Sequence, residues 1–124
     1  MAVANGQDWR PYKVATDLSL APNQYKIVKM TAASTVGLAT ASTDKLIGVL
    51  QNRPKVGEAA SVATEGRVLC QAGAAVAVGD RITANASSQG IATTTAQDTY
   101  LGIAVTAASN AGEIFEVELQ HGTV

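Results

Sequence analysis

The residues of this chain whose types support catalysis are few, and they form no recognisable set. His121, in the stretch "LQHGTV", is the only histidine among the 124 residues. General acid–base catalysis needs paired titratable groups, and zinc sites are built mainly from several histidine and cysteine ligands. The patterns G-x-S-x-G and H-E-x-x-H are absent, as are a phosphate-binding loop and a calcium-binding loop. We therefore expect no enzymatic activity, no cofactor and no bound metal.

The acidic residues occupy positions that favour turn stabilisation over reaction. Aspartate side chains commonly accept backbone hydrogen bonds at turns. Glu116 and Glu118 fall on one face of an alternating segment, which predicts a solvated face. Four aspartates lie at or near predicted turns: Asp17, Asp44, Asp80 and Asp98.

One lysine suggests a different chemistry, the covalent attachment of a cofactor. Biotin and lipoyl carrier domains place a modified lysine beside methionine at a hairpin tip, and they begin strands with Gly-Asp turns. This chain has Lys29 in "IVKM" and Gly79-Asp80 in "AAVAVGDRIT". However, Lys29 precedes Gly79 by 79 − 29 = 50 residues and lies inside an alternating segment, without a small-residue tip beside it. A small carrier or accessory domain modified at Lys29 is kept as the alternative from another class.

The composition argues against nucleic-acid and membrane partners. Hydrophobic residues make up 47% of the chain but aromatic residues only 4%, so the core must consist mostly of small aliphatic side chains. The net charge is −1, and no block of like charge marks a nucleic-acid-binding patch or a membrane-surface helix. The single cysteine, Cys70, lies in the apolar run "GRVLCQAG", which predicts a buried thiol. Because we find neither a signal peptide nor an apolar run of membrane-spanning length, we expect synthesis in a reducing cytoplasm.

The elements that must position these residues are short β-strands. Apolar and polar residues alternate with period two in several segments, and turn residues recur between them. This pattern predicts a mainly β, single-domain body of sandwich or barrel type over residues 14–124. The alanine-rich segment 55–66 favours a helix by propensity, but its glycines and β-branched residues argue against a long one. The predicted strands lie in residues 25–32, 45–52, 66–72, 80–86, 99–107 and 113–120.

The two halves of the body are weakly similar in sequence. "VGLATASTDKLIGVL" (36–50) resembles "GIATTTAQDTYLGIAV" (90–105), and the match extends over residues 25–58 and 80–113 at offsets of 53 to 55. Either the halves share a true internal repeat, or similar turn residues arose convergently. A glycine inside "LIGVL" and another inside "YLGIAV" predict a bulge or a close backbone contact.

The first thirteen residues are predicted to form an extended arm. They contain turn-forming residues together with aromatic side chains, and an aromatic residue in a terminal segment usually packs against something. We therefore expect the arm to dock on a partner. Its candidate contacts with a capsid or with a sister subunit are Trp9, Arg10 and Tyr12.

Residues 36–119 resemble the head decoration proteins of tailed phages, also called capsid cement proteins. The resemblance rests on a "TEGRV" segment, an "AGAAVAVGDRI" turn, a Gly-x-Ala strand after a polar turn, and the ending "LGIAVTAASNAGEIFEVEL". It implies a small β-rich domain on the outer surface of an icosahedral head. Such domains commonly cluster as homotrimers and bridge neighbouring major capsid proteins against the internal pressure of the DNA. The resemblance implies no catalytic residue.

A second structural alternative is another part of a virion or surface array. A head fibre base, a tail-tube component and a secreted adhesin all belong to this class. Tail-tube proteins need long hairpins for stacking, and the predicted strands are short. An adhesin needs a secretion signal, and we see none in this sequence.

Overall fold

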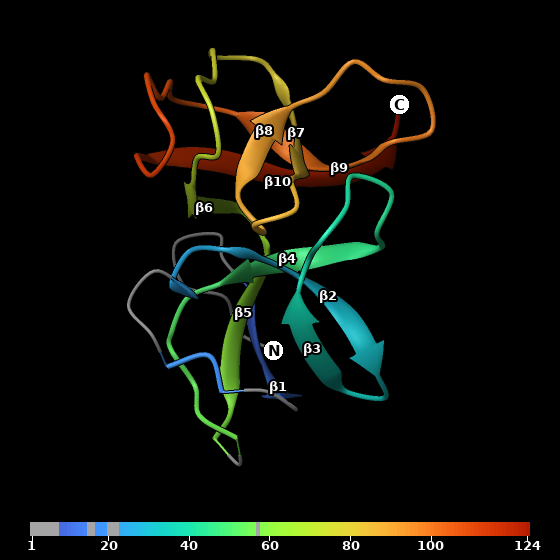
Figure 1. Cartoon of the computed structure of the whole chain (residues 1–124), viewed down its shortest axis with the longest axis vertical. Helices are drawn as coiled ribbons and strands as arrows, with labels where there is room; N and C mark the ends of the chain where they lie inside the picture. The colour runs from blue at the N-terminus through green and yellow to red at the C-terminus, as the bar shows by residue number, and fades with distance from the viewer. Residues whose placement is uncertain (1–7, 15–16, 20–22, 57) are drawn as a thin grey trace.

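The computed structural model describes residues 8–14, 17–19, 23–56 and 58–124, with only the backbone described for 8–11. This part of the chain contains ten strands in two five-stranded sheets. In Figure 1 the first sheet runs from blue to green and the second from yellow to red. The strands are β1 (Asp8–Val14), β2 (Ile27–Ala32), β3 (Thr35–Leu38), β4 (Leu46–Leu50), β5 (Ala60–Glu65), β6 (Arg67–Gln71), β7 (Arg81–Ala84), β8 (Gly90–Ala92), β9 (Thr99–Ala104) and β10 (Ile114–Thr123).

The predicted mainly β fold is confirmed. Each of the six segments chosen for period-two alternation coincides with a strand, namely β2, β4, β6, β7, β9 and β10, of which β10 runs three residues beyond its segment. The alanine-rich segment 55–66, for which a short helix was considered, instead ends in β5. Among the described residues, no helix is long and apolar enough to cross a membrane.

The first sheet closes on itself as a barrel with the strand order β1-β3-β2-β4-β5. The closure is made by β1, which pairs antiparallel with β5 and parallel with β3. On the β3 side the paired residues of β1 are Lys13 and Val14, beyond Pro11. Proline, which has no N–H to donate, is tolerated in a strand where one edge is not paired.

The second half of the segment predicted as an arm is therefore part of the barrel. Residues 8–14 form β1, and Trp9 pairs with Ala63 of β5. Residues 1–7 lie outside the described part of the chain. The domain boundaries proposed from the sequence remain a prediction for those residues.

The second sheet follows the same plan as the first. Its order is β6-β10-β9-β7-β8, which matches β1-β5-β4-β2-β3 when each strand is paired with its counterpart in the other half. An isolated parallel bridge between Ala72 and Gly90 links its two edges, where the barrel has the β1–β3 pair.

Backbone hydrogen bonds recur between the halves at one offset. The N–H of Tyr25 donates to the Leu50 carbonyl, and 79 − 25 = 54 positions later that of Gly79 donates to Ala104. Positive φ angles recur with the same spacing, at Tyr25 (69°) and Gly79 (92°). Two further bonds repeat in this way: Leu50 to Lys26 with Ala104 to Asp80, and Ala39 to Ile27 with Thr93 to Arg81. Whether this likeness reflects duplication of an ancestral unit stays a hypothesis.

Two apolar clusters form the core, and the larger one spans both halves. The smaller cluster fills the barrel with side chains such as Val28, Val36 and Val62. The larger one lies within the second sheet and continues onto outward-facing residues of the barrel, including Ile27, Val49 and Ala63. Because β5 contributes Val62 to one cluster and Ala63 to the other, its two faces are both buried. Neighbouring residues of a strand point to opposite faces, so one strand joins both cores.

The four turn aspartates accept hydrogen bonds, and Asp98 also connects the halves. As predicted, Asp17, Asp44 and Asp80 accept backbone N–H bonds within their own turns. Asp98 is buried and accepts hydroxyl bonds from Thr93 (2.7 Å) and, across the junction, from Ser42 (2.8 Å). A buried carboxylate needs such partners to offset the loss of hydration.

Candidate functional site

An open hollow lies at one end of the barrel. The first residues of β1 and β4 and the last residues of β2 and β5 meet at this end, because β1 and β4 run opposite to their neighbours β5 and β2. The hollow has a volume of about 390 Å³. We call it the mouth hollow; it is lined by Tyr12, Met30, Ile47 and Thr64, with Lys45, Leu46 and His121 on the side toward the second sheet.

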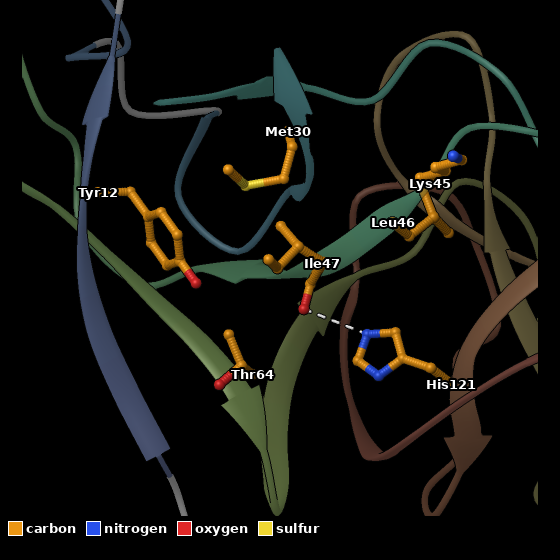
Figure 2. Close-up of a pocket in the computed structure, with 7 residues that line it drawn as sticks. All are labelled: Tyr12, Met30, Lys45, Leu46, Ile47, Thr64 and His121. Atoms are coloured by element: carbon orange, nitrogen blue, oxygen red, sulfur yellow. Dashed lines mark hydrogen bonds between the residues drawn. The ribbon is translucent and has the colours of Figure 1, made fainter. Parts of the chain in front are cut away.

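The lining side chains of the mouth hollow continue the barrel core toward solvent. Met30 lies two residues after Val28, and Thr64 two residues after Val62, so each shares the inward face of its strand. Tyr12 and Ile47 are half-buried and pack against the cluster that fills the barrel. Figure 2 shows these side chains directed toward one space. Met30 remains 38% exposed, which leaves apolar surface open at the mouth.

A second hollow adjoins the first across the junction of the two halves. Its volume is about 310 Å³, and it shares Lys45, Leu46 and His121 with the mouth hollow. Its remaining lining comes from β9 and β10 and includes Tyr100 and Gly122. Because they share three lining residues, the two hollows adjoin, and we name the pair the furrow; its lining reaches from the barrel mouth to β9 and β10.

A hydrogen bond joins the two halves where the hollows adjoin. The Nε2 atom of His121 donates to the carbonyl oxygen of Ile47 at 3.1 Å, which ties β10 to β4 (Figure 2). At the far end the guanidinium of Arg81 lies 5.4 Å from the centre of the Tyr100 ring, a cation–π distance. Among the described residues that line the two hollows, none is acidic.

The candidate contact residues from the sequence fall on β1. Tyr12 lines the mouth hollow. Trp9 and Arg10 pair with Ala63 and Val62 through their backbones, and their side chains lie outside the described part of the structure. Met30 and Ile47 were not predicted from the sequence as surface residues. Apolar residues in an alternating strand predict a core, and only the barrel closure shows that these two lie at its open end.

The lysine considered for modification is held inside a strand. Lys29 lies within β2, and its Nζ is 3.1 Å from Oδ2 of Asp44 and 3.2 Å from Oγ1 of Thr40. A hydrogen bond from the Thr40 backbone, with the nearby Lys29, keeps the pKa of the Asp44 carboxyl below its ordinary value. An ion-paired lysine away from a hairpin tip lacks the free, projecting amine that a carrier lysine needs. This geometry disfavours the carrier alternative.

The remaining chemically interesting groups are isolated. Cys70 is buried, as predicted, and burial raises the pKa of its thiol to about 12, which disfavours the reactive thiolate. His121 belongs to no group of three or more histidine, cysteine or acidic side chains that could hold a metal ion, since the described residues contain none. The lining of the furrow offers apolar surface, hydrogen-bonding groups and the charge of Lys45.

Comparisons with known proteins agree with this picture. Comparison with curated proteins gives no significant match. Among solved structures, the crystal structure of the head fiber gp8.5 N base of bacteriophage phi29 has a TM-score of 0.70 at 15% identity. The match covers 95% of this chain and 98% of that chain, and at this identity it shows a shared fold. A family model described as phage cement protein matches residues 20–119, most of the chain. The chain therefore belongs to the phage cement protein family, a family of structural, capsid-associated phage proteins.

Proposed function

We propose that this protein binds the outer surface of a phage head and stabilises the lattice of the major capsid protein, without catalysis. The observation that carries the proposal is the family match over residues 20–119. The isolated positions of Cys70 and His121 and the near-neutral charge of the chain support a binding role over a chemical one. Many identical copies on a lattice make individually weak contacts effective through avidity.

We further propose that the chain acts as a homotrimer on the capsid and is made in the host cytoplasm. A trimer would present three copies of the same surface at a three-fold position of the shell. This proposal comes from the family resemblance, in which such domains cluster at three-fold and local three-fold sites.

The test is co-sedimentation of the purified chain with undecorated, expanded heads of the phage that encodes it. We expect binding to saturate at a fixed number of copies per major capsid subunit, counted on a stained gel. A ratio of three copies per local three-fold site would support the trimer. If the folded chain stays in the supernatant at every concentration, the proposed function is wrong.

Replacing Trp9 with alanine is expected to weaken attachment to the heads. Buried aromatic anchors often carry much of the binding energy of an interface, and we expect a loss of about 1–3 kcal/mol. Binding isotherms from the co-sedimentation measure the loss. The melting temperature of the variant is the control, because Trp9 lies on β1 and its replacement must leave the barrel folded. Unchanged occupancy on the shell would refute the role of Trp9.

A second candidate function is the base of a head fibre. The shared fold with the head fiber N base of phi29 favours it. Both candidates place the chain on a phage head, and they differ in what the bound copies carry. Electron cryomicroscopy of complete phage particles separates them, because a fibre base has a projecting fibre above each bound copy and a cement protein does not.

A further inference from the structure

We propose that the furrow formed by the two hollows is the surface that docks on the head, and that it receives an extended, apolar segment of the shell protein carrying acidic side chains. This inference rests on the proposed function and names the surface that performs it. Three features of the furrow support it: the apolar lining at the barrel mouth, the positive charge at the middle and the shape.

Apolar surface is open to solvent at the barrel mouth. Met30 is one of the few large apolar side chains with more than a third of its surface exposed, and unlike Val56 it opens into a hollow. Tyr12 and Ile47 beside it already pack on the barrel core. An apolar side chain entering the hollow would extend that core and cover the exposed part of Met30. Burial of apolar surface is the main favourable term in such association.

The middle of the furrow carries positive charge. Lys45 and His121 are exposed and line both hollows, whereas no described residue of the lining is acidic. The whole chain carries more acidic than basic residues, 10 against 9, so an acid-free furrow with a lysine at its centre is not the average surface. Opposite charges on two surfaces guide association and fix register. Carboxylates on the docking segment are therefore the complementary groups.

The course of the furrow suits an extended segment of chain. The furrow crosses from the mouth of the barrel over β4 to β9 and β10, and the bond between His121 and Ile47 joins the two halves beneath it. An extended chain places alternate side chains on one side with a short, regular spacing. One such segment can fill the mouth hollow and still reach the hollow beside Tyr100.

The experiment compares two furrow variants with two matched controls in binding to undecorated heads. Met30→Glu places a carboxylate at the mouth, and Val56→Glu makes the same change at a residue that lines neither hollow. Lys45→Glu reverses the central charge, and Arg53→Glu reverses an exposed charge outside the furrow. We expect at least tenfold weaker binding for each furrow variant, near wild-type binding for both controls, and unchanged melting temperatures for all four. Lys45→Arg should bind like the wild-type chain.

The outcomes separate this inference from the proposed function. If wild-type chain binds heads and both furrow variants bind equally well, the furrow is not the docking surface and the proposed function stands. If wild-type chain does not bind, both fail. Sedimentation equilibrium of the free chain tests whether a second copy of this chain occupies the furrow instead. If Met30→Glu turns a wild-type oligomer into a monomer, a second copy of this chain fills the furrow and the inference is overturned.

Discussion

Replacing Phe115 with alanine is expected to lower the free energy of unfolding by about 3–5 kcal/mol, the usual range for removing a buried aromatic ring. Phe115 is the largest fully buried side chain among the described residues and is only 1% exposed. It is also the only phenylalanine of the chain. The cluster around it contains mainly valine, alanine, leucine and isoleucine. Such side chains are too short to fill the space that the ring would leave.

Denaturant unfolding of the purified chain measures this loss. Ile114→Ala is the matched control, because Ile114 precedes Phe115 on β10, faces the other side of the sheet and is 44% exposed. We expect that control to cost less than about 1 kcal/mol, as is usual for surface positions. Phe115→Leu should fall between the two. Equal losses for Phe115→Ala and Ile114→Ala would contradict the assignment of Phe115 as the centre of the core.

Most of the strands that the sequence predicted show alternation of apolar and polar residues. In β10, Phe115 and Val117 are buried and their neighbours are more exposed, and the residue types follow this pattern. β3 and β8 have four and three residues, so each offers little alternation. β7 is also only four residues long, but the Gly79-Asp80 turn before it marks its start. β5 was not predicted for a different reason. Both of its faces are buried, so small apolar residues lie on both and apolar residues do not alternate with polar ones.

The furrow depends on contacts that local patterns do not encode. His121 and Ile47 are 74 positions apart, and their hydrogen bond exists because β10 and β4 meet at the junction of the halves. Met30 is indistinguishable in sequence from a core residue of β2. It becomes a surface residue because β1 closes the barrel by a parallel pair with β3 and leaves this end open. Closure and register arise from the whole chain. The turn aspartates act within their own turns, and the glycines inside strands stand out in the local sequence, so both were predictable.

The two glycines inside strands lie at positions where a side chain has no room. Gly48 of β4 and Gly102 of β9 lie 102 − 48 = 54 positions apart, as do the recurring hydrogen bonds. A Cβ atom at Gly48 would overlap the carbonyl oxygen of Ala63, and one at Gly102 that of Glu118. This confirms the predicted close backbone contact. Both obstacles are main-chain atoms within a sheet, so neither can rotate away as a side chain does.

We therefore expect Gly48→Ala and Gly102→Ala each to destabilise the fold by about 3 kcal/mol, at the upper end of overpacking costs. Thermal and denaturant unfolding measure the two losses. Gly79→Ala is the control, because Gly79 has a positive φ of 92° and no neighbouring atom within 4 Å of its added Cβ. The left-handed backbone alone costs about 1–2 kcal/mol for a residue with a side chain. If Gly48→Ala lowers the free energy of unfolding no more than Gly79→Ala does, β4 and β5 can move apart to accept the methyl group. Glycine at position 48 would then not be required by the close approach of the two strands.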